Sequence, residues 1–323
     1  MNFHALTEPP PELLGQALEN FEQQFRYPLG DSGFFHISHG RDYLPFFSAM
    51  GEASVGVAER DGEVLGTLTR VKRWLEIRSG PKGTEAPDTL LAHYLCDLKL
   101  SPAARGSTVL ARIIREAKNP IESSETQKVY CVVMDGTGRL PTDYTGRLGV
   151  PAFENLGEIM VLRLSVVKRA MNTPLLPSVS AQEMRKLREL LPREGYGTVG
   201  GMSEHRSLME PLHWIGQDGL SCGTIEDTRR GKRLFLDSGD ELQSAHLSGF
   251  AYATAESGAG LLRMALAACA PMDLPALFVA VPRGEFSALL PHLQGIDVLQ
   301  APATVYGHGL NPGQDWWVDT AEI

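Results

Sequence analysis

The chain has 323 residues, which at about 150 residues per domain is enough for two domains. Hydrophobic residues make up 43% and charged residues 21%, a composition that excludes a largely disordered chain. With 30 Lys and Arg against 39 Asp and Glu, the formal charge is -9. That charge argues against a nonspecific nucleic-acid binder and against a protein that docks on anionic membranes, because both need a positive surface.

The sequence also carries signals about compartment and metal content. Its first residues lack a basic stretch followed by an apolar one, and no apolar run reaches the roughly 18 residues of a membrane span. Neither C-x-x-C nor H-E-x-x-H occurs. We therefore expect a cytoplasmic protein with no metal site and with free thiols at its four widely spaced cysteines: Cys96, Cys131, Cys222 and Cys269.

The predicted elements of the first half alternate between strands and helices. Regularly spaced apolar residues predict a helix over 12–25. Asp61-Gly62 predicts a tight turn between strands at 54–59 and 63–70, because both residues tolerate positive φ. The remaining predicted elements are a strand at 93–100, a helix at 108–117, and strands at 128–134 and 158–167.

A segment with two prolines, 171–181, predicts a linker between domains at 1–170 and 182–323. The second domain repeats patterns of the first in the same order. Asp61-Gly62 returns as Asp218-Gly219, Ala92-His93 as Ala245-His246, and the strand 129–133 as 277–281. We therefore predict a duplicated domain.

The most informative stretch is the turn between the strand at 93–100 and the helix at 108–117. It contains Arg105-Gly106-Ser107-Thr108 directly before the helix. Free N–H groups at a helix N-terminus attract anions, Arg105 adds a positive charge, and Gly106 lets the backbone approach a ligand closely. This arrangement is typical of a pyrophosphate-binding site.

Strand, turn and helix together resemble the acetyl-CoA motif of the GCN5-related N-acetyltransferase (GNAT) superfamily, whose turn reads Gln/Arg-x-x-Gly-x-Gly/Ala. The resemblance covers about residues 50–165 and returns at about 210–320. It implies an α/β protein of two tandem domains, each a mixed central sheet flanked by helices, with acetyl-CoA as cosubstrate. It further implies that the main chain of Leu98 and Leu100 pairs with the pantetheine arm. The residues implied to hold the pyrophosphate are Arg105, Gly106, Ser107 and Thr108.

The corresponding turn in the second half has a different charge. It keeps a Gly-x-Gly spacing at Gly258 and Gly260, but it has no basic residue, and Glu256 would repel a pyrophosphate. We therefore expect the second domain to have the fold but a weakened or lost cofactor site.

Acyl transfer to an amine benefits from a general base and from an acid near the leaving sulfur. The strand period of two places His93 and Asp97 on one face, which makes Asp97 the first candidate base and His93 its alternate or partner. Polar residues at a strand surface or edge are the alternative interpretation. The resemblance implies a tyrosine acid on a helix before a Leu-Gly-Phe-like corner, and Tyr144 precedes Leu148-Gly149 here.

We therefore predict an N-acyltransferase that moves an acetyl group from acetyl-CoA to the amine of a small molecule or peptide. The alternative is a non-catalytic binding or assembly module with degenerate acetyltransferase folds. Three departures from the family pattern favour that alternative: Ala103 in place of Gln or Arg, Thr108 in place of Gly or Ala, and Tyr144 one residue further from the glycine. A homodimer is expected only from the general frequency of two-fold oligomers.

Overall fold

The structure, a computed structural model, describes residues 1–28, 33–78, 87–166, 178–199 and 203–323. Thirteen strands of this part of the chain join in one mixed sheet, in the order β1-β4-β5-β6-β7-β15-β8-β14-β13-β11-β10, with β9 beside β5 and β16 beside β9. A small separate sheet has the order β12-β3-β2. Among the described residues, no helix has the length and apolar character that crossing a membrane requires.

The strands have these bounds: β1 Asn2–Leu6, β2 Tyr27–Pro28, β3 Phe34–Ser38, β4 Glu52–Arg60, β5 Glu63–Arg78, β6 Asp88–Leu100, β7 Val129–Met134, β8 Glu154–Ser165, β9 Gly195–Thr198, β10 Leu212–Ile215, β11 Ser221–Glu226, β12 Arg233–Leu236, β13 Ala245–Tyr252, β14 Ala276–Pro282, β15 Val298–His308 and β16 Trp316–Trp317. The helices are α1 Glu12–Glu22, α2 Pro45–Ser48, α3 Val109–Glu122, α4 Ala181–Leu190, α5 Ser203–Arg206, α6 Ala255–Cys269 and α7 Arg283–Leu289.

The predicted hairpin between β4 and β5 is confirmed. Asp61 and Gly62 form its turn with φ of 54° and 83°, the backbone conformation that this residue pair tolerates best. Helix α1 begins where the apolar spacing predicts but ends at Glu22, three residues earlier than expected. All four cysteines are free.

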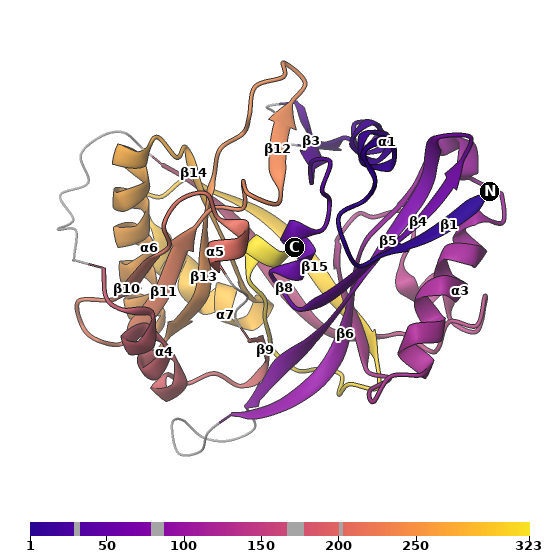
Figure 1. The fold of residues 1–323 in the computed structure, drawn as a ribbon. Helices are drawn as coiled ribbons and strands as arrows, with labels where there is room; N and C mark the ends of the chain where they lie inside the picture. Colours follow the sequence, from indigo (N-terminus) through magenta and orange to yellow (C-terminus); the bar gives the residue numbers. More distant parts are fainter. Residues whose placement is uncertain (29–32, 79–86, 167–177, 200–202) are drawn as a thin grey trace.

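Two halves of the chain contain corresponding elements in the same order. β4, β5, β6, α3, β7 and β8 in the first half correspond to β10, β11, β13, α6, β14 and β15 in the second. The first five elements of each set lie on opposite sides of the molecule, whereas β8 and β15 exchange places at its centre (Figure 1). The halves nevertheless share one sheet, because β15 lies between β7 and β8 and pairs with both. Of the predicted linker, 171–177 lie outside the described residues, and Ala181 already begins α4.

In the first half, β6 and β7 run parallel but separate almost at once. Their ladder has two pairs, His93 with Val129 and Tyr94 with Tyr130, although β6 continues to Leu100. The last six residues of β6 therefore keep β5 as a neighbour on one edge and have no strand on the other edge, within the described residues.

The same separation occurs in the second half between β13 and β14. Their ladder also has two pairs, Ala245 with Leu277 and His246 with Phe278. By ladder position His93 corresponds to Ala245, so the sequence match of His93 to His246 is wrong by one residue. The one-residue error arises because the sequence comparison matched the two histidines, whereas the strand ladder matches His93 with Ala245.

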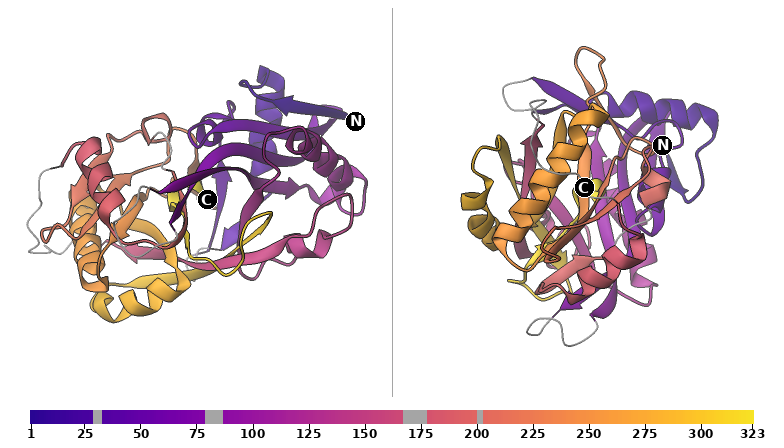
Figure 2. Two further views of the ribbon diagram at one scale, coloured as in Figure 1. Left: turned by 90° about the horizontal axis from the view of Figure 1, so that it is seen from below. Right: turned by 90° about the vertical axis from the view of Figure 1, so that its left-hand side faces the viewer.

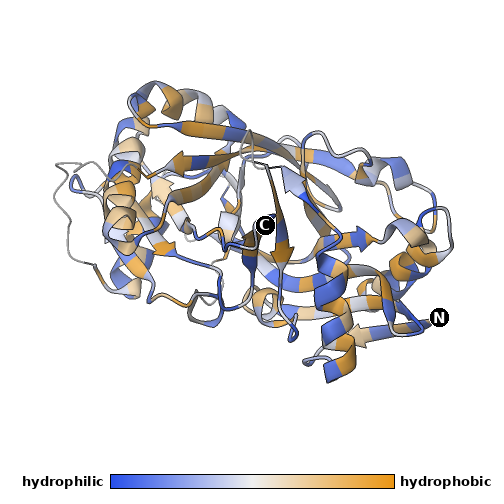
Figure 3. Cartoon of the chain, turned by 90° about the horizontal axis from the view of Figure 1, so that it is seen from above, coloured by the Kyte–Doolittle hydropathy of each residue, from blue (hydrophilic) through white to orange (hydrophobic). Residues whose placement is uncertain are grey.

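Helices cover both faces of the first half of the sheet. Ile113 of α3 packs against Leu65 on one face, and Phe21 of α1 belongs to the cluster around Val71 on the other. In the second half α6 covers one face of the sheet (Figure 2), and Figure 3 shows that hydrophobic stretches follow the central strands. These layers fix β6 between α1 and α3.

The C-terminal segment lies at the centre of the molecule, between the two halves (Figures 1 and 2). There the buried Glu322 carboxylate accepts from Arg73 Nη1 of β5 at 2.7 Å and from Arg206 Nη1 of α5 at 2.9 Å. Arg206 also forms a two-pronged bond to Glu226 of β11, at 2.6 and 3.0 Å. One carboxylate thus joins charged groups from both halves.

Replacing Glu322 with glutamine should destabilise the fold strongly. Glu322→Gln leaves two buried guanidinium groups with reduced compensation, and breaking a buried pair in this way costs about 3–5 kcal/mol of unfolding free energy. Urea unfolding measures the loss. Arg26→Gln, which breaks the exposed Arg26–Asp237 pair, should cost at most about 1 kcal/mol. Equal losses in the two variants would contradict the central role of Glu322.

Candidate functional site

A β-bulge interrupts β6 between Cys96 and Lys99, shortly before the strand ends at Leu100. The ladder with β5 pairs Thr69 with Cys96 and Thr67 with Lys99, so β6 has one more residue than β5 at this point. Asp97 takes up the extra length with φ of 55°, the left-handed region that few residues other than glycine adopt. A conformation of this kind is a local feature that the surrounding contacts must hold in place.

The bulge changes which side chains share a face. Leu95 packs in the cluster under α3, whereas Lys99 reaches Glu22 of α1 on the opposite face. His93 lies on the Leu95 face because the period of two is intact between them. The prediction that His93 and Asp97 share one face is therefore wrong, since the extra residue inverts the alternation.

The bulge also changes which backbone groups face the open edge. The N–H of His93 donates to the carbonyl of Lys128, next to the start of β7, at 2.8 Å. The N–H of Ser101 instead donates to the carbonyl of Leu65 in β5, at 2.9 Å. Strict alternation would send both groups to the same side, so the extra residue turns the N–H groups of Leu98 and Leu100 away from β5. They face the side on which β6 has no strand neighbour among the described residues.

The loop after β6 leads these groups to the N-terminus of α3. Four exposed residues predicted to hold the pyrophosphate lie there: Arg105, Gly106, Ser107 and Thr108. Gly106 has φ of 74°, which explains the glycine. Within the described residues, the first-turn N–H groups of Leu110 and Ala111 donate to no acceptor. The helix end therefore offers free donors, on half-buried residues, beside the positive charge of an exposed arginine.

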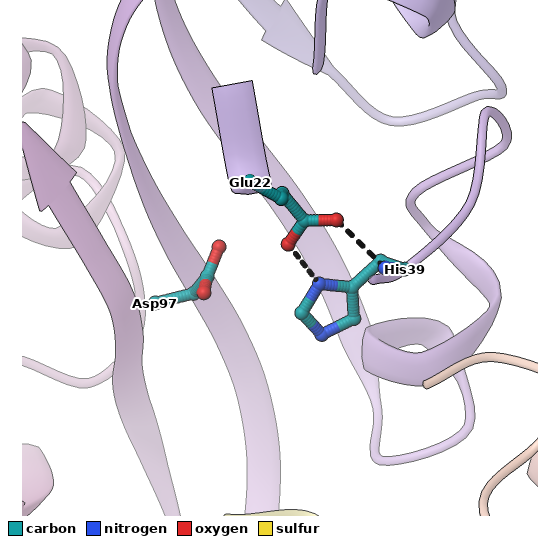
Figure 4. A group of neighbouring side chains, drawn as sticks. All are labelled: Glu22, His39 and Asp97. Carbon is teal, nitrogen blue, oxygen red and sulfur yellow. Dashed lines mark hydrogen bonds and ion pairs between the residues drawn. The ribbon is translucent and has the colours of Figure 1, made fainter. Parts of the chain in front are cut away.

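Asp97 itself is held in a buried polar network with partners on α1 and the following loop. Its Oδ1 lies 2.6 Å from Lys99 Nζ, and its Oδ2 accepts from the Tyr43 hydroxyl at 2.5 Å. Lys99 Nζ also bonds Glu22 at 2.9 Å, and Glu22 accepts from the N–H of His39 and contacts its Nδ1, both at 2.7 Å. Figure 4 shows Asp97 facing Glu22 and His39. Both oxygens of the candidate base are therefore engaged.

Charge pairing determines the protonation of this network. Burial alone would raise the pKa of Glu22, but His39 and Lys99 outweigh it and hold the pKa at about 2. Burial likewise opposes the charge of Lys99, yet Asp97 and Glu22 raise its pKa well above the ordinary value. Burial, followed by the charge of Asp97, raises the pKa of Tyr43. The network thus contains the ionised carboxylate of Glu22 beside the ammonium group of Lys99.

The network has the spacing of a cation site, although its cation is already part of the chain. One ligand atom each from Glu22, His39 and Asp97 lies within 4.8 Å of the others. Lys99 Nζ bonds both carboxylates at 2.9 and 2.6 Å, so its ammonium supplies the positive charge that a metal would bring. The geometry is that of a salt-bridge network.

The second candidate base, His93, is buried and both of its ring nitrogens are engaged. Arg70 Nη1 lies 3.2 Å from Nδ1, and Nε2 lies 3.2 Å from the carbonyl of Thr126. Because a guanidinium group can only donate, Nδ1 accepts and Nε2 carries the proton. Burial and then the charge of Arg70 lower the pKa of His93 to about 4, so the ring is neutral at pH 7.

The candidate acid, Tyr144, is distant in sequence from every residue of this network. It ends a four-residue 3-10 turn, Pro141–Tyr144, and the residues between β7 and β8 form no α-helix. The helix that the resemblance implied at this position is therefore absent, because Pro141 and several glycines favour turns over a longer helix. Its role as an acid stays a prediction.

Sequence reasoning missed four members of the network: Glu22, His39, Tyr43 and Lys99. A usable signal existed for Lys99, since Asp97-x-Lys99 puts opposite charges two residues apart in an otherwise apolar strand. No comparable signal marked Glu22, because it is one of several polar residues in α1 and nothing in the sequence distinguishes it from the others. Only the fold brings α1 over the bulge.

The corresponding bulge in the second half is filled by the chain itself. Gly249 has φ of 62°, and its N–H donates to Asp319 Oδ1 at 2.7 Å. The next carbonyl, of Phe250, accepts from Arg193. The edge of β13 that corresponds to the open edge of β6 is thus occupied by groups from two other segments.

The helix N-terminus beside that edge is closed as well. Thr254 Oγ1 accepts from the N–H of Ser257, and Ser257 Oγ accepts from the N–H of Thr254, both at 3.2 Å. Glu256 lies in the first turn, where its charge opposes an anion. In helix α3, by contrast, the Thr108 side chain makes no cap bond, the N–H of Val109 donates to Ser107 Oγ at 3.2 Å, and an arginine lies beside the helix start.

Comparison with known proteins bears on the fold. No family model and no curated protein matches the sequence. The structure is similar to one of Saccharomyces cerevisiae N-myristoyltransferase with bound myristoyl-CoA, with a TM-score of 0.59, 8% identity and coverage of 96% of this chain and 79% of that one. A second structure of that enzyme with bound myristoyl-CoA, also at 8% identity and a TM-score of 0.59, covers 94% of this chain and 82% of its own.

A GCN5-related N-acetyltransferase from Anabaena variabilis also aligns, with 13% identity, 94% of this chain, 72% of that chain and a TM-score of 0.49, which is too low to carry an argument. The likeness to N-myristoyltransferase concerns the fold. This chain has the tandem α/β fold of the GNAT type, as predicted from its sequence. The arrangement of its two halves is the one found in N-myristoyltransferase.

The low pKa of Glu22 makes a testable prediction about stability. The pKa falls from 4.5 to about 2 on folding, so the charge of Glu22 stabilises the fold above pH 4.5, and this contribution disappears as the pH falls through 2. The difference in unfolding free energy between the wild type and Glu22→Gln should therefore shrink over that range. Urea unfolding at a series of pH values measures it. A difference that stays constant with pH would contradict the charged network.

Proposed function

We propose that this protein is an N-acyltransferase that uses one CoA thioester per chain, bound in the first half, and transfers its acetyl group to an amine. One observation carries the proposal. Among the described residues, the end of β6 has no strand on one edge and leads to the exposed turn before α3, whereas the corresponding edge of β13 is occupied by Asp319 and Arg193. This difference favours the first of the two related half-sites as the place of the ligand.

In this proposal the cofactor extends from the helix to the bulge. Arg105 and the turn residues Gly106, Ser107 and Thr108 bind the pyrophosphate at the start of α3, where a helix N-terminus with free donors favours an anion. The free donors are the N–H groups of Leu110 and Ala111, whereas the N–H of Ser107 already donates to the carbonyl of Ala104. The amide groups of the pantetheine arm then pair with the free backbone of Leu98 and Leu100, as an added strand would. The arm therefore completes the sheet at the place where β7 leaves β6.

The reaction is direct transfer of the acyl group. A neutral amine attacks the thioester carbonyl, the C–N bond forms, the C–S bond breaks, and the proton released from nitrogen passes to the CoA thiolate or to water. The N–H of Leu98 stabilises the negative charge that develops on the carbonyl oxygen. Catalysis then comes mainly from positioning.

The side chains predicted to assist have different places in this proposal. Asp97 acts as a positioning residue: Tyr43 and Lys99 hold its carboxylate, and its left-handed backbone orients the N–H of Leu98. His93 supports β6 from the α3 face. The acceptor is an amine of a small molecule or a peptide, as predicted from the sequence.

The cofactor site can be tested by calorimetric titration with acetyl-CoA. We expect one molecule bound per chain. Arg105→Glu should weaken binding by about tenfold to a hundredfold, because a hydrogen bond to a charged group contributes about 1.5–3 kcal/mol and the reversed charge adds repulsion. The matched control is Glu256→Arg at the corresponding helix of the second half, which should leave both affinity and stoichiometry unchanged.

Two outcomes would contradict the proposal. Binding of two molecules per chain would show that the second half-site is also open. Absence of binding at millimolar acetyl-CoA would favour the non-catalytic module, since the fold alone would then remain.

A further inference from the structure

We propose that Lys232, contributed by the second half, is the general base that takes the proton from the acceptor amine. This inference rests on the proposed function and adds a catalytic residue to it. Lys232 directly precedes β12 and is 6% exposed. Its Nζ donates to the carbonyl of Ile323 at the centre of the molecule and lies 4.5 Å from the centroid of the Phe46 ring (Figure 1).

The loop that carries Lys232 is fixed by its own hydrogen bonds and by contact with the first half. The N–H of Lys232 donates to the carbonyl of Thr228 at 2.7 Å, and Thr228 Oγ1 donates to the carbonyl of Lys232 at 3.0 Å. Gly231 lets α2 approach closely, because a Cβ there would lie 2.6 Å from the backbone nitrogen of Phe46. The lysine is therefore held in place against an element of the first half.

The direction from which the amine attacks follows from the position of the thioester. A carbonyl that accepts from the N–H of Leu98 extends the sheet at its edge, so its two faces look toward the two sides of the sheet. Helix α3 covers one of these sides, where Ile113 packs in one cluster with Leu95. The amine therefore approaches from the other side, which Cys96 and Lys99 face.

Lys232 lies on this second side, within electrostatic reach of both halves. Its charge acts on the Cys96 thiol and the Asp97 carboxylate of β6, and on the ring of His246 in β13. Asp97 directly precedes Leu98, whose N–H meets the thioester carbonyl in the proposed function. A base from the second half thus stands beside the ligand site of the first.

The charge of Lys232 lacks the kind of partner that other buried cations have. Carboxylate oxygens lie within 4.0 Å of four of them: Arg73, Lys99, Arg188 and Arg206. Among the residues that the structure describes, no aspartate or glutamate side chain comes that close to Lys232. A buried ammonium group in this position favours its neutral form, which is the form that accepts a proton.

The surroundings of Lys232 agree with this protonation state. Burial, followed by the charge of Arg206, lowers the pKa of Lys232 to about 8, close to the pH at which a general base works best. Lys99 acts in the same direction, whereas Cys96 and Asp97 act in the opposite one. The charge of Arg206 is shared with Glu226 and Glu322, which it binds directly.

The other titratable groups near Lys232 are poorly suited to take the proton. Burial raises the pKa of the Cys96 thiol well above its ordinary value, and the carboxylates beside Lys99 raise the pKa of that ammonium, so both stay protonated. Both oxygens of Asp97 already have partners. Burial lowers the pKa of His246 well below its ordinary value, which makes its ring a weak base. Lys232 remains as the proton acceptor.

Lys232 gives the proton a complete route through the reaction. The amine nitrogen attacks the thioester carbonyl and forms the C–N bond, and the neutral Nζ of Lys232 takes the proton from that nitrogen. The C–S bond then breaks, and the proton passes from Lys232 to the CoA thiolate. Lys232 is neutral again at the end of each cycle, and no further reactant is needed.

The variant Lys232→Met tests the charge state without any acceptor. The lysine has a pKa of about 8 in the folded protein against 10.5 as its ordinary value, so between these values the unfolded chain holds the proton that the folded one has lost. The wild type therefore gains stability relative to Lys232→Met as the pH rises from 8 to 10.5. Urea unfolding of both proteins measures the change. A difference between their midpoints that stays constant over this range would overturn the inference.

The catalytic role is tested by CoA release from acetyl-CoA with hydroxylamine as the acceptor, because this small nucleophile is already neutral at pH 7. The rate in the wild type should rise with pH and level off above about pH 8. In Lys232→Met the rate at pH 8 should fall about a hundredfold or more and the rise should disappear, while the affinity for acetyl-CoA in calorimetry stays the same.

Two further variants separate the base from its charge and from lysines in general. Lys232→Arg keeps the positive charge but cannot release its proton, so it should be as slow as Lys232→Met. The matched control is Lys72→Met, which removes a lysine that binds Glu52 Oε2 at 2.7 Å on the α3 side of the sheet. It should leave the rate and its pH profile unchanged. Thermal unfolding verifies that each variant is folded.

The outcomes distinguish this inference from the proposed function. A wild type that does not bind acetyl-CoA, or binds it without transfer to hydroxylamine, contradicts the proposed function. If the wild type transfers the acetyl group and the folded Lys232 variants do so at the same rate and with the same pH profile, the proposed function survives and Lys232 is not the base. An active Lys232→Arg beside an inactive Lys232→Met would show that only the charge matters, which also overturns the assignment.

Discussion

The left-handed backbone at Asp97 is the constraint on which the candidate site depends. One extra residue there turns the N–H groups of Leu98 and Leu100 to the open edge and moves Lys99 to the α1 face. A non-glycine residue in this conformation needs external support, and Tyr43 and Lys99 give it by binding both carboxylate oxygens. Buried charge, backbone conformation and exposed donors are thus parts of a single arrangement.

The two halves show how one topology can be made open or closed. Both have a bulge next to a two-pair parallel ladder, and both place a helix after it. In the second half Gly249 needs no side-chain support, and its N–H is used internally by Asp319. The bulge that lies beside the open edge in one half therefore fastens the C-terminal segment in the other.

Much of the fold was predictable because it follows from local patterns. Asp61-Gly62 specifies its turn by allowed backbone angles, and the apolar period specifies α3 and the strands around it. The site was less predictable, because the bulge inverts a period that sequence reasoning must assume to be regular. His93 and Asp97 were accordingly placed on one face. Contacts such as that of Lys99 with Glu22 depend on α1 folding over β6, and no local sequence pattern predicts a contact between residues so far apart in the chain.

The position of β15 has a consequence for the way in which the chain acquires its structure. β7 and β8 belong to the first half, yet the strand that joins them, Val298–His308, is synthesised only after β14 of the second half. Until then both strands expose unpaired edges, which are templates for aggregation. Pairings over such sequence separations also slow folding. The first half therefore cannot complete its share of the sheet on its own, because the strand between β7 and β8 comes from the second half.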